Sequence, residues 1–446
     1  MKKYFFEEKK VLVCGMARSG QAAAKKLHEL GATVTVTDSN KETNFDNKYG
    51  LTCLFGQDPF DFVHEFELII ISPGISVYAP FVKKAVSLGI PVWGEVELFY
   101  ILCPCPIIAI TGTNGKTTVT TLVGKIMKLK NNGTVIAGNI GLPLTEIVSD
   151  LKESDLVVAE ISSFQLETVQ NFRPKISAIL NMTEDHLDRH GTMQKYIEEK
   201  TKIFQNQGQD DVVVLNYDNS ITKNMKPPSK AIYFSTHDTE FSSVYLRDGN
   251  IFVGDEVIMP ISKTKVLAEN ALAATAIAYT AGATKEQIAK VLEEFNGVDH
   301  RLEYVTKVNN VSYYNDSKAT NVDSTIKALE SFKNPVILIA GGYDKNTDFT
   351  PLVKLFSKNV KHLFLIGQTA SQFAKTCKDL DFNLYTLSDT LENAVFSAKN
   401  IAASGDTILF SPACASFDQF KNFEERGEKF KEYILYGKKE CTRRLC

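Results

Sequence analysis

Residues 111–118 (TGTNGKTT) are the strongest candidate for chemistry in this sequence. They follow the apolar run 107–110 and precede a helical pattern, which is the strand–loop–helix context of a phosphate-binding loop. In such a loop the backbone N–H groups and the helix N-terminus attract phosphate oxygens. Lys116 can then reach the β- and γ-phosphates, and the Thr117 hydroxyl can bind Mg²⁺. The usual pattern has a glycine where this chain has Ile110, so we predict a shortened nucleoside triphosphate-binding loop.

Acidic residues and histidines follow the next two predicted strands. Glu160 ends the apolar run 156–160, where P-loop proteins carry a metal-binding carboxylate, although a strand-end glutamate can also simply face solvent. Residues 183–190 (TEDHLDRH) follow another apolar strand, and His186 and its acidic neighbours could bind a metal or transfer protons. A solvated loop is the alternative. Because parallel strands place ligands at their carboxyl ends, we expect both groups beside the phosphate-binding loop.

Lys200 occupies an unusual place in a helical pattern. Apolar side chains recur at helical spacing around it, at Met193, Tyr196, Ile197, Ile203 and Phe204. A lysine within such a stripe usually extends to water. Alternatively, desolvation keeps a buried amine neutral, and that amine could react with CO₂ to form a carbamate that binds a metal as a carboxylate does. The pattern leaves both readings open.

Residues 15–20 (GMARSG) resemble a dinucleotide fingerprint with alanine at its second glycine, and Asp38 lies in the expected region downstream. The turn could hold NAD, the pyrophosphate of another nucleotide, or no ligand. Four further polar stretches occur in the last third of the chain, at residues 300–301, 315–321, 341–345 and 411–416, and each alone is more often a loop than a site. Together they predict a ligand-facing rim, since arginine and lysine suit phosphate or carboxylate recognition.

Strands and helices alternate along the chain, which predicts parallel βαβ units and an α/β fold. Its 446 residues suit three domains at about 150 residues each. We expect a Rossmann-like domain at 1–97 and a P-loop ATPase-like domain at 98–298. The second domain should have a parallel sheet with peripheral antiparallel strands from about 212–260. A second Rossmann-like domain should span 299–446.

The composition of the chain excludes several classes of function. Lys and Arg number 50 against 53 Asp and Glu, a net charge of −3, which excludes nucleic-acid binding by bulk charge. No apolar run approaches the roughly 18–20 residues that cross a bilayer, and the N-terminus lacks the apolar core of a secretory signal. The 8 cysteines are sparse and form no CxxC, as expected for reduced thiols. We therefore expect a soluble cytoplasmic protein.

The sequence resembles the Mur ligases of bacterial cell-wall synthesis through motifs spread along the whole chain. These are TGTNGKTT, EISSFQLE, NMTEDHLDRH, HRLE, NDSKATN and SPACASFDQFKNFEERG. NDSKATN and the last motif are similar to the branch that adds D-glutamate, rather than L-alanine, a diamino acid or D-Ala-D-Ala. The resemblance implies that ATP phosphorylates the L-alanyl carboxylate of UDP-N-acetylmuramoyl-L-alanine and that the D-glutamate amine attacks the acyl phosphate. It also implies a monomer with small-molecule substrates, no nucleic acid and no membrane insertion.

The resemblance assigns site residues by position. Those implied to bind ATP are Gly112, Thr113, Asn114, Gly115, Lys116, Thr117, Thr118, Asn270, Arg301 and Asp316. Those implied to hold two Mg²⁺ ions are Thr117, Glu160, His186 and Lys200 as its carbamate, and the catalytic set is Lys116, Glu160, His186 and Lys200. UDP-substrate residues are Ser19, Asp38, Ser39, Ser72, Pro73, Gly74 and Asn139. D-Glutamate residues are Asp185, Lys318, Thr320, Lys345, Ser416 and Phe423. The active site is expected between domains, with the C-terminal domain closing on it.

Three other functions compete with this interpretation. Folylpolyglutamate synthases share the P-loop plan and also add glutamate, but they typically lack a separate dinucleotide-type domain before that loop. A nucleotide-driven switch should carry an NKxD guanine motif, which is absent from this sequence. An NAD-dependent dehydrogenase would leave the P-loop unexplained and needs an acid–base partner that the first domain does not offer.

Overall fold

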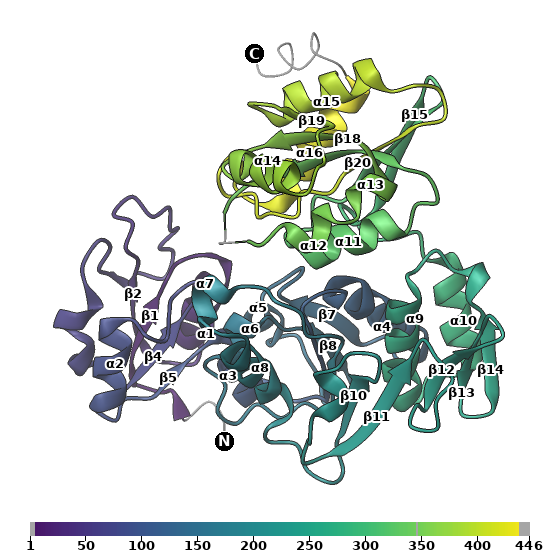
Figure 1. Ribbon diagram of the computed structural model, residues 1–446. Helices are drawn as coiled ribbons and strands as arrows, with labels where there is room; N and C mark the ends of the chain where they lie inside the picture. Colours follow the sequence, from purple (N-terminus) through teal and green to yellow (C-terminus); the bar gives the residue numbers. More distant parts are fainter. Residues whose placement is uncertain (1–4, 345–346, 437–446) are drawn as a thin grey trace. The chain divides into compact units, whose positions relative to one another are not determined.

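The computed structural model describes residues 5–344 and 347–436, so the predicted D-glutamate residue Lys345 lies outside the described part. The chain divides into two compact units. The first comprises the chain up to Glu184 together with Arg189–Phe295, and the second comprises Asp185–Asp188 together with the chain from Asn296 onward. Both units are α/β, as the alternation of elements predicts (Figure 1).

The first unit begins with a parallel sheet of order β3-β2-β1-β4-β5. Its strands are β1 (Lys10–Cys14), β2 (Thr33–Thr37), β3 (Thr52–Cys53), β4 (Leu68–Ile71) and β5 (Val92–Trp93). The helices are α1 (Arg18–Glu29), α2 (Pro80–Ser87) and α3 (Glu95–Leu102). The apolar runs of β1 and β4 are buried on both faces, which is why they are continuous rather than alternating. The short strand β3 escapes sequence prediction because it has no apolar run.

Helix α3 ties this first sheet to the following one. The buried carboxylate of Glu97 accepts hydrogen bonds from the backbone N–H groups of Gln170 (2.9 Å), Asn171 (2.8 Å) and Phe172 (3.2 Å). Trp93 Nε1 donates to the Gln170 side chain at 3.2 Å. A buried carboxylate with several N–H donors is satisfied without a cation, so Glu97 is a structural joint.

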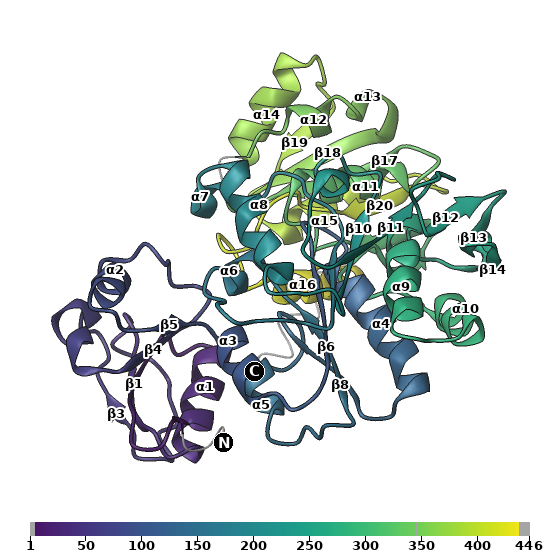
Figure 2. The ribbon, with the colours of Figure 1, turned by 90° about the horizontal axis from the view of Figure 1, so that it is seen from below.

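The second sheet of the same unit has the order β14-β13-β12-β11-β10-β9-β6-β8-β7. Its strands are β6 (Ile107–Thr111), β7 (Thr134–Gly138), β8 (Leu156–Glu160), β9 (Ile176–Ile179), β10 (Val212–Asn216), β11 (Lys230–Ser235), β12 (Val244–Arg247), β13 (Asn250–Val253) and β14 (Glu256–Pro260). Its helices are α4 (Lys116–Lys130), α5 (Leu144–Ile147), α6 (Ser163–Leu166), α7 (Leu187–His190), α8 (Met193–Thr201), α9 (Ala268–Thr280) and α10 (Lys285–Glu294), although the second unit takes the first half of α7. Helices α4, α9 and α10 pack together (Figures 1 and 2).

The segment 212–260 corrects one detail of the sequence prediction. Strand β10 pairs in parallel with β9 and β11, and β12 joins β11 in parallel, so these strands extend the main sheet. Only β12, β13 and β14 form the expected antiparallel meander. The buried apolar run of β10 is typical of a strand with neighbours on both sides. The change of direction occurs at Asp248 and Gly249, whose φ angles of 50° and 73° suit a tight hairpin.

The second unit has a sheet of order β15-β16-β20-β17-β18-β19. Its strands are β15 (Glu303–Val308), β16 (Val311–Asn315), β17 (Val336–Gly341), β18 (Val360–Ile366), β19 (Tyr385–Leu387) and β20 (Thr407–Phe410). The helices are α11 (Val322–Glu330), α12 (Thr350–Val353), α13 (Phe356–Asn359), α14 (Ala370–Asp379), α15 (Leu391–Ile401) and α16 (Phe423–Leu435). The hairpin β15–β16 was not predicted, although its Asn309-Asn310 turn, with φ of 49° and 63°, carries a recognisable signal.

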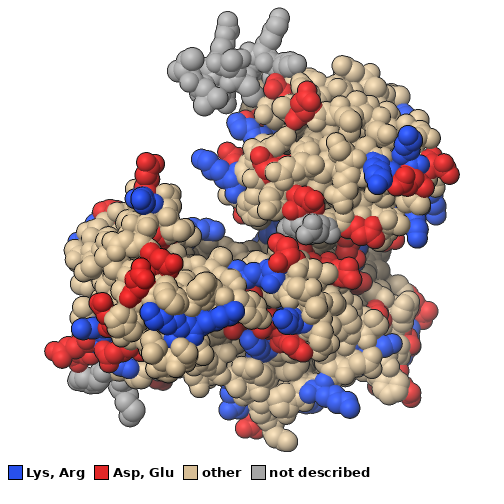
Figure 3. All heavy atoms as spheres, turned by 60° about the vertical axis from the view of Figure 1, so that its left-hand side comes forward, with Lys and Arg blue, Asp and Glu red and all other residues tan. Residues whose placement is uncertain are grey.

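Basic and acidic side chains alternate over the face of the molecule drawn in Figure 3, in keeping with the near-neutral charge of the sequence. Among the residues that the structure describes, no helix combines the length and apolar character that a membrane span requires.

Candidate active site

The phosphate-binding loop lies where the order of the second sheet reverses. Strand β6 is flanked by β8 and β9, so the loop after Thr111 emerges between the ends of both neighbours. Gly115 caps helix α4 with φ of 82°, and a Cβ there would lie 2.4 Å from Asn270 Oδ1. Glycine is therefore required at this position for two reasons: its backbone has a positive φ, and Asn270 leaves no room for a side chain. The same contact brings Asn270, a predicted ATP residue, against the loop.

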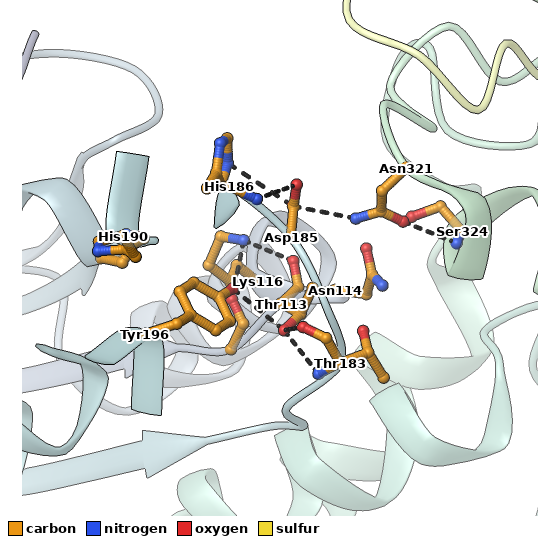
Figure 4. A network of polar contacts seen from close by, with 12 residues as sticks. Thr113, Asn114, Lys116, Thr183, Asp185, His186, His190, Tyr196, Asn321 and Ser324 are labelled. Carbon is orange, nitrogen blue, oxygen red and sulfur yellow. Dashed lines mark hydrogen bonds and ion pairs between the residues drawn. The ribbon is translucent and has the colours of Figure 1, made fainter. Parts of the chain in front are cut away.

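Two residues that sequence reasoning missed hold the loop in place. Asn181, just after β9, accepts from Asn114 N at 2.8 Å through its side chain and from Thr113 N at 3.0 Å through its backbone. The Tyr196 hydroxyl lies 3.1 Å from Thr113 Oγ1, which also accepts from Thr183 N at 3.0 Å (Figure 4). Asn181 begins the motif NMTEDHLDRH, of which only the histidine and the acidic residues were considered from the sequence. Tyr196 was considered there only as an apolar residue of the helix around Lys200.

The structure excludes one of the two interpretations of Lys200, the lysine that extends to water. Its side chain is buried, with the residue only 1% exposed, and its Nζ donates to Gly112 O at 3.0 Å and Thr111 Oγ1 at 3.3 Å. The same Nζ lies 4.8 Å from the centre of the Tyr196 ring, a cation–π distance. Lys200 therefore reaches the phosphate-binding loop from α8 and does not extend to water.

Glu160 ends β8 beside the loop, in register with Ile110 of β6. Its Oε1 accepts from Asn139 Nδ2 at 2.7 Å, and its buried Oε2 has no hydrogen-bond partner. The buried Thr118 hydroxyl likewise has none. A desolvated carboxylate oxygen without a donor fits a cation site, and carboxylate oxygens are ligands that Mg²⁺ prefers. Asn139, which the resemblance implies to contact the UDP substrate, is thus hydrogen-bonded to this carboxylate.

No group of three or more His, Cys, Asp and Glu side chains with a metal-binding arrangement occurs within residues 5–344 and 347–436. Of the implied metal residues, Thr117, Glu160 and Lys200 belong to the first unit and His186 to the second.

His186 has a strained backbone. Its φ is 55°, unusual for a residue with a side chain, and such strain is often found at functional sites. Its N–H donates to Asp185 Oδ1 at 2.9 Å, and Asp185 Oδ2 accepts from Asn321 Nδ2 at 3.1 Å (Figure 4). Asp185, implied as a D-glutamate residue, thus holds His186 and Asn321 within the second unit.

A pocket of about 450 Å³ opens at the glycine turn of the first sheet. Asp38 and Ser39, both implied as UDP-substrate residues, line it together with Gly15. Asp38 Oδ2 accepts from Met16 N at 2.7 Å. Ser72 supports the turn from behind by donating to Gly15 O at 2.6 Å.

The remaining lining residues of this pocket carried no motif signal. They are Cys14, Thr37, Gly56, Gln57, Asp58, Pro59, Ile75 and Phe81. The implied residues Ser19, Pro73 and Gly74 are not part of the lining.

In the second unit Asp316 is a buried carboxylate. Its Oδ2 accepts from Ser411 Oγ at 2.7 Å and its Oδ1 from Leu302 N at 3.0 Å. Burial raises the pKa of Asp316 to about 6, and the nearby positive charge of Arg301 opposes that rise. The buried Nε of Arg301 has no hydrogen-bond partner, so this arginine retains a donor for a ligand.

The implied D-glutamate residues Lys318 and Phe423 are in contact, since Lys318 Nζ lies 4.8 Å from the ring centre. The Thr320 N–H donates to Lys318 O at 3.0 Å, and Ser416 is buried. Cys414 is buried too, and burial raises the pKa of its thiol to about 12, in keeping with a small core residue rather than a reactive thiol.

Arg426 is a further residue that sequence reasoning missed. It is 1% exposed and donates to Ser317 Oγ (3.1 Å), Ser317 O (2.8 Å), Ala415 O (3.0 Å) and Cys414 O (3.0 Å). Burial lowers its pKa to about 10. The planar fork of arginine binds together the segments 315–321 and 411–416, two of the four loops for which the sequence predicts a ligand-facing rim.

Family models match three successive parts of the chain. They are described as the Mur ligase MurD-like N-terminal domain (residues 9–94), the Mur ligase middle domain (110–278) and the Mur ligase glutamate ligase domain (300–414). The chain belongs to the Mur ligase family. Among its relatives, the UDP-N-acetylmuramoylalanine–D-glutamate ligases of Caldanaerobacter subterraneus and Clostridioides difficile are each 43% identical, over 96% of this chain and 98% of theirs.

Solved structures of Mur ligases share the fold at lower identity. The UDP-N-acetylmuramate–alanine ligase MurC of Thermotoga maritima aligns with a TM-score of 0.61 and 20% identity, covering 97% of this chain and 100% of that one. MurF of Thermotoga maritima, solved in complex with ADP, aligns with a TM-score of 0.61 and 16% identity, covering 97% of each chain. A folylpolyglutamate synthase/dihydrofolate synthase of Yersinia pestis covers only 76% of this Mur ligase, at a TM-score of 0.58 and 15% identity.

Proposed function

We propose that this Mur ligase adds D-glutamate to UDP-N-acetylmuramoyl-L-alanine in an ATP-dependent reaction of peptidoglycan precursor synthesis. The observation that carries the proposal is the 43% identity, over nearly full length, to ligases named for this reaction. The phosphate-binding loop with Glu160 and Lys200 beside it supplies the chemistry. Because ATP and uridine nucleotides are cytoplasmic substrates, we also propose a cytoplasmic enzyme, acting as a monomer.

In the proposed reaction the L-alanyl carboxylate attacks the γ-phosphorus of ATP, and ADP leaves. The D-glutamate amine then attacks the acyl phosphate carbonyl, and the tetrahedral intermediate expels phosphate. The anionic carboxylate and the triphosphate repel each other, so positive groups must lie between them. Lys116 serves this role on the phosphates, together with the N–H groups of residues 115–118 at the N-terminus of α4.

Thr117, Glu160, His186 and a carbamate on Lys200 are the residues proposed to hold Mg²⁺. Bound by these residues, Mg²⁺ would supply positive charge to offset that of the phosphates and of the acceptor carboxylate. Asn139 fixes the orientation of Glu160 through its hydrogen bond to Oε1, which leaves Oε2 for the cation. His186 is also proposed to orient the acceptor or to take a proton from the incoming amine.

The N-terminal pocket is proposed to bind the uridine diphosphate part, with Asp38 and Ser39 at the uracil. In the second unit Asp316 and Arg301 are proposed to contact ATP. Lys318, Thr320, Lys345, Ser416 and Phe423 are proposed to bind D-glutamate, because two lysines and two hydroxyls suit a substrate with two carboxylates.

Phosphate release from ATP in the presence of UDP-N-acetylmuramoyl-L-alanine tests the proposal. D-Glutamate should support release, whereas L-glutamate, L-lysine and D-alanine should not, and mass spectrometry should show the amide product. Release without the nucleotide sugar, or preference for another amino acid, would contradict the substrate assignment. Both units are proposed to serve one reaction, so ATP and nucleotide sugar together should compact the protein in small-angle scattering.

A further inference from the structure

Arg189 joins the loop after β4 to the segment after β8. Its Nη1 donates to Gly74 O at 3.1 Å and its Nη2 to Ile75 O at 2.8 Å. On its other side, Nε and Nη2 donate to the two carboxylate oxygens of Glu167 at 3.1 and 2.5 Å. The guanidinium also lies 4.8 Å from the ring centre of Phe164. All these residues belong to the first unit.

Of the two carbonyls that Arg189 holds, one belongs to a residue that lines the N-terminal pocket, and the other belongs to Gly74 next to it in the chain. Ile75 lines that pocket, and Ser72, at the start of the same turn, supports Gly15. The turn is closed by Ile75 N donating to Ser72 O at 2.9 Å. A Cβ on Gly74 would meet nothing within 4 Å, so side-chain packing does not brace the turn at that residue. Arg189 therefore braces the turn through its backbone.

Glu167 fixes the guanidinium from the opposite side. Its side chain is 4% exposed, and it also lies 3.7 Å from His190 Nδ1. His190 Nε2 in turn lies 3.0 Å from Ser163 Oγ, on the segment that follows Glu160. The bidentate geometry requires a planar fork, which lysine cannot replace.

We propose that Arg189 is a positioning residue for the nucleotide-sugar substrate: through Gly74 and Ile75 it sets the wall of the uridine pocket against the middle domain. This rests on the proposed assignment of that pocket to a uridine nucleotide. Arg189 acts through the backbone of the pocket wall and not on the phosphate-binding loop. Its loss therefore weakens binding of the nucleotide sugar and leaves binding of ATP unchanged.

The test is calorimetric binding of UDP, UDP-N-acetylmuramoyl-L-alanine and ATP to the full chain, with KM and kcat for each substrate. Arg189→Met should weaken both uridine ligands about tenfold or more, with ATP affinity kept within about twofold. Arg189→Lys should show the same loss because one ammonium cannot satisfy four acceptors. The double variant Arg189→Met with Glu167→Gln should behave like Arg189→Met, which shows that the effect does not come from an orphaned carboxylate.

Arg173→Met is the matched control. Arg173 pairs with the buried carboxylate of Asp211 at 2.6 Å in the same unit, without contact to the pocket loop. It should leave all three affinities unchanged. Three outcomes would overturn the proposal. The first two are an equal loss of affinity for ATP and for the uridine ligands in Arg189→Met, and an unchanged affinity of that variant for UDP. The third is the same selective loss in Arg173→Met as in Arg189→Met. If Arg189→Met does not fold, unchanged UDP affinity in Arg189→Lys overturns it. Failure of the wild-type protein to bind UDP would instead refute the assignment of the pocket.

Discussion

Lys116 and Lys200 donate to the same atom, the backbone carbonyl oxygen of Gly112, each at 3.0 Å. One lysine begins helix α4 after the loop, and the other comes from α8. Two amines on one carbonyl place both lysine side chains at one edge of the phosphate-binding loop. The carbamate proposed for Lys200 would put a negative charge at the same place, beside Lys116. Modification of Lys200 would therefore change the electrostatics of the whole loop.

Substitution of Lys200 by methionine should keep the fold and abolish most activity. Methionine fills the buried stripe without a charge to desolvate, so thermal stability should be equal or higher. Phosphate release should fall by about 100-fold or more, as for loss of a charged group at a transition state. Lys195→Met is the control, because Lys195 is exposed on the same helix and should not change the rate. Near-wild-type activity of Lys200→Met would exclude a carbamate role.

Alanine at Gly115 should remove ATP binding. The new Cβ would lie 2.4 Å from Asn270 Oδ1, at a φ of 82°. Gly249→Ala is the control, because Gly249 has φ of 73° but no atom within 4 Å of a Cβ. Both variants should lose about 1–2 kcal/mol of stability from the left-handed backbone. Only Gly115→Ala should lose ATP affinity by calorimetry, and equal ATP binding in the two variants would refute the steric argument.

Phenylalanine at Tyr196 should raise KM for ATP, because the hydroxyl lies 3.1 Å from Thr113 Oγ1 in the loop. Loss of one hydrogen bond should cost about 1 kcal/mol of stability. Tyr245→Phe, which removes a 2.8 Å hydrogen bond to Gly254 O in the distant meander, should show a similar stability loss with unchanged KM. A raised KM in both variants would indicate a global effect instead.

Asp316 should make stability fall as pH rises from about 4 to about 6. Burial raises its folded-state pKa to about 6 from the ordinary 3.8, so the folded state binds more protons than the unfolded state in this window. The cost approaches about 3 kcal/mol above pH 6, at 1.36 kcal/mol for each pH unit. Asp316→Asn should remove this slope in urea titrations across pH 4–7, and an unchanged slope would assign it to other groups.

Much of the fold could be predicted from local patterns. Strand β8 was predicted with the bounds that the structure has, residues 156–160, because a continuous apolar run is a strong signal of a buried parallel strand. The parallel pairing of β10 and β11 was missed, because strand direction depends on partners that lie elsewhere in the sequence. The short strands β3 and β19 also escaped, since partly exposed edge strands need little apolar sequence.

In the candidate site, too, some features can be predicted from the sequence and others are visible only in the structure. The sequence by itself determined the phosphate-binding loop, the carboxylate at the end of β8 and the family resemblance, because these depend on residue types at fixed local spacing. Only the tertiary structure decided that Lys200 is buried and points at Gly112, since periodicity cannot distinguish a lysine that extends to water from one that does not. Asn181, Tyr196, Arg189 and Arg426 were likewise found only in the structure. Their partners lie up to 115 residues away, and a hydrogen bond between distant segments leaves no local pattern to read.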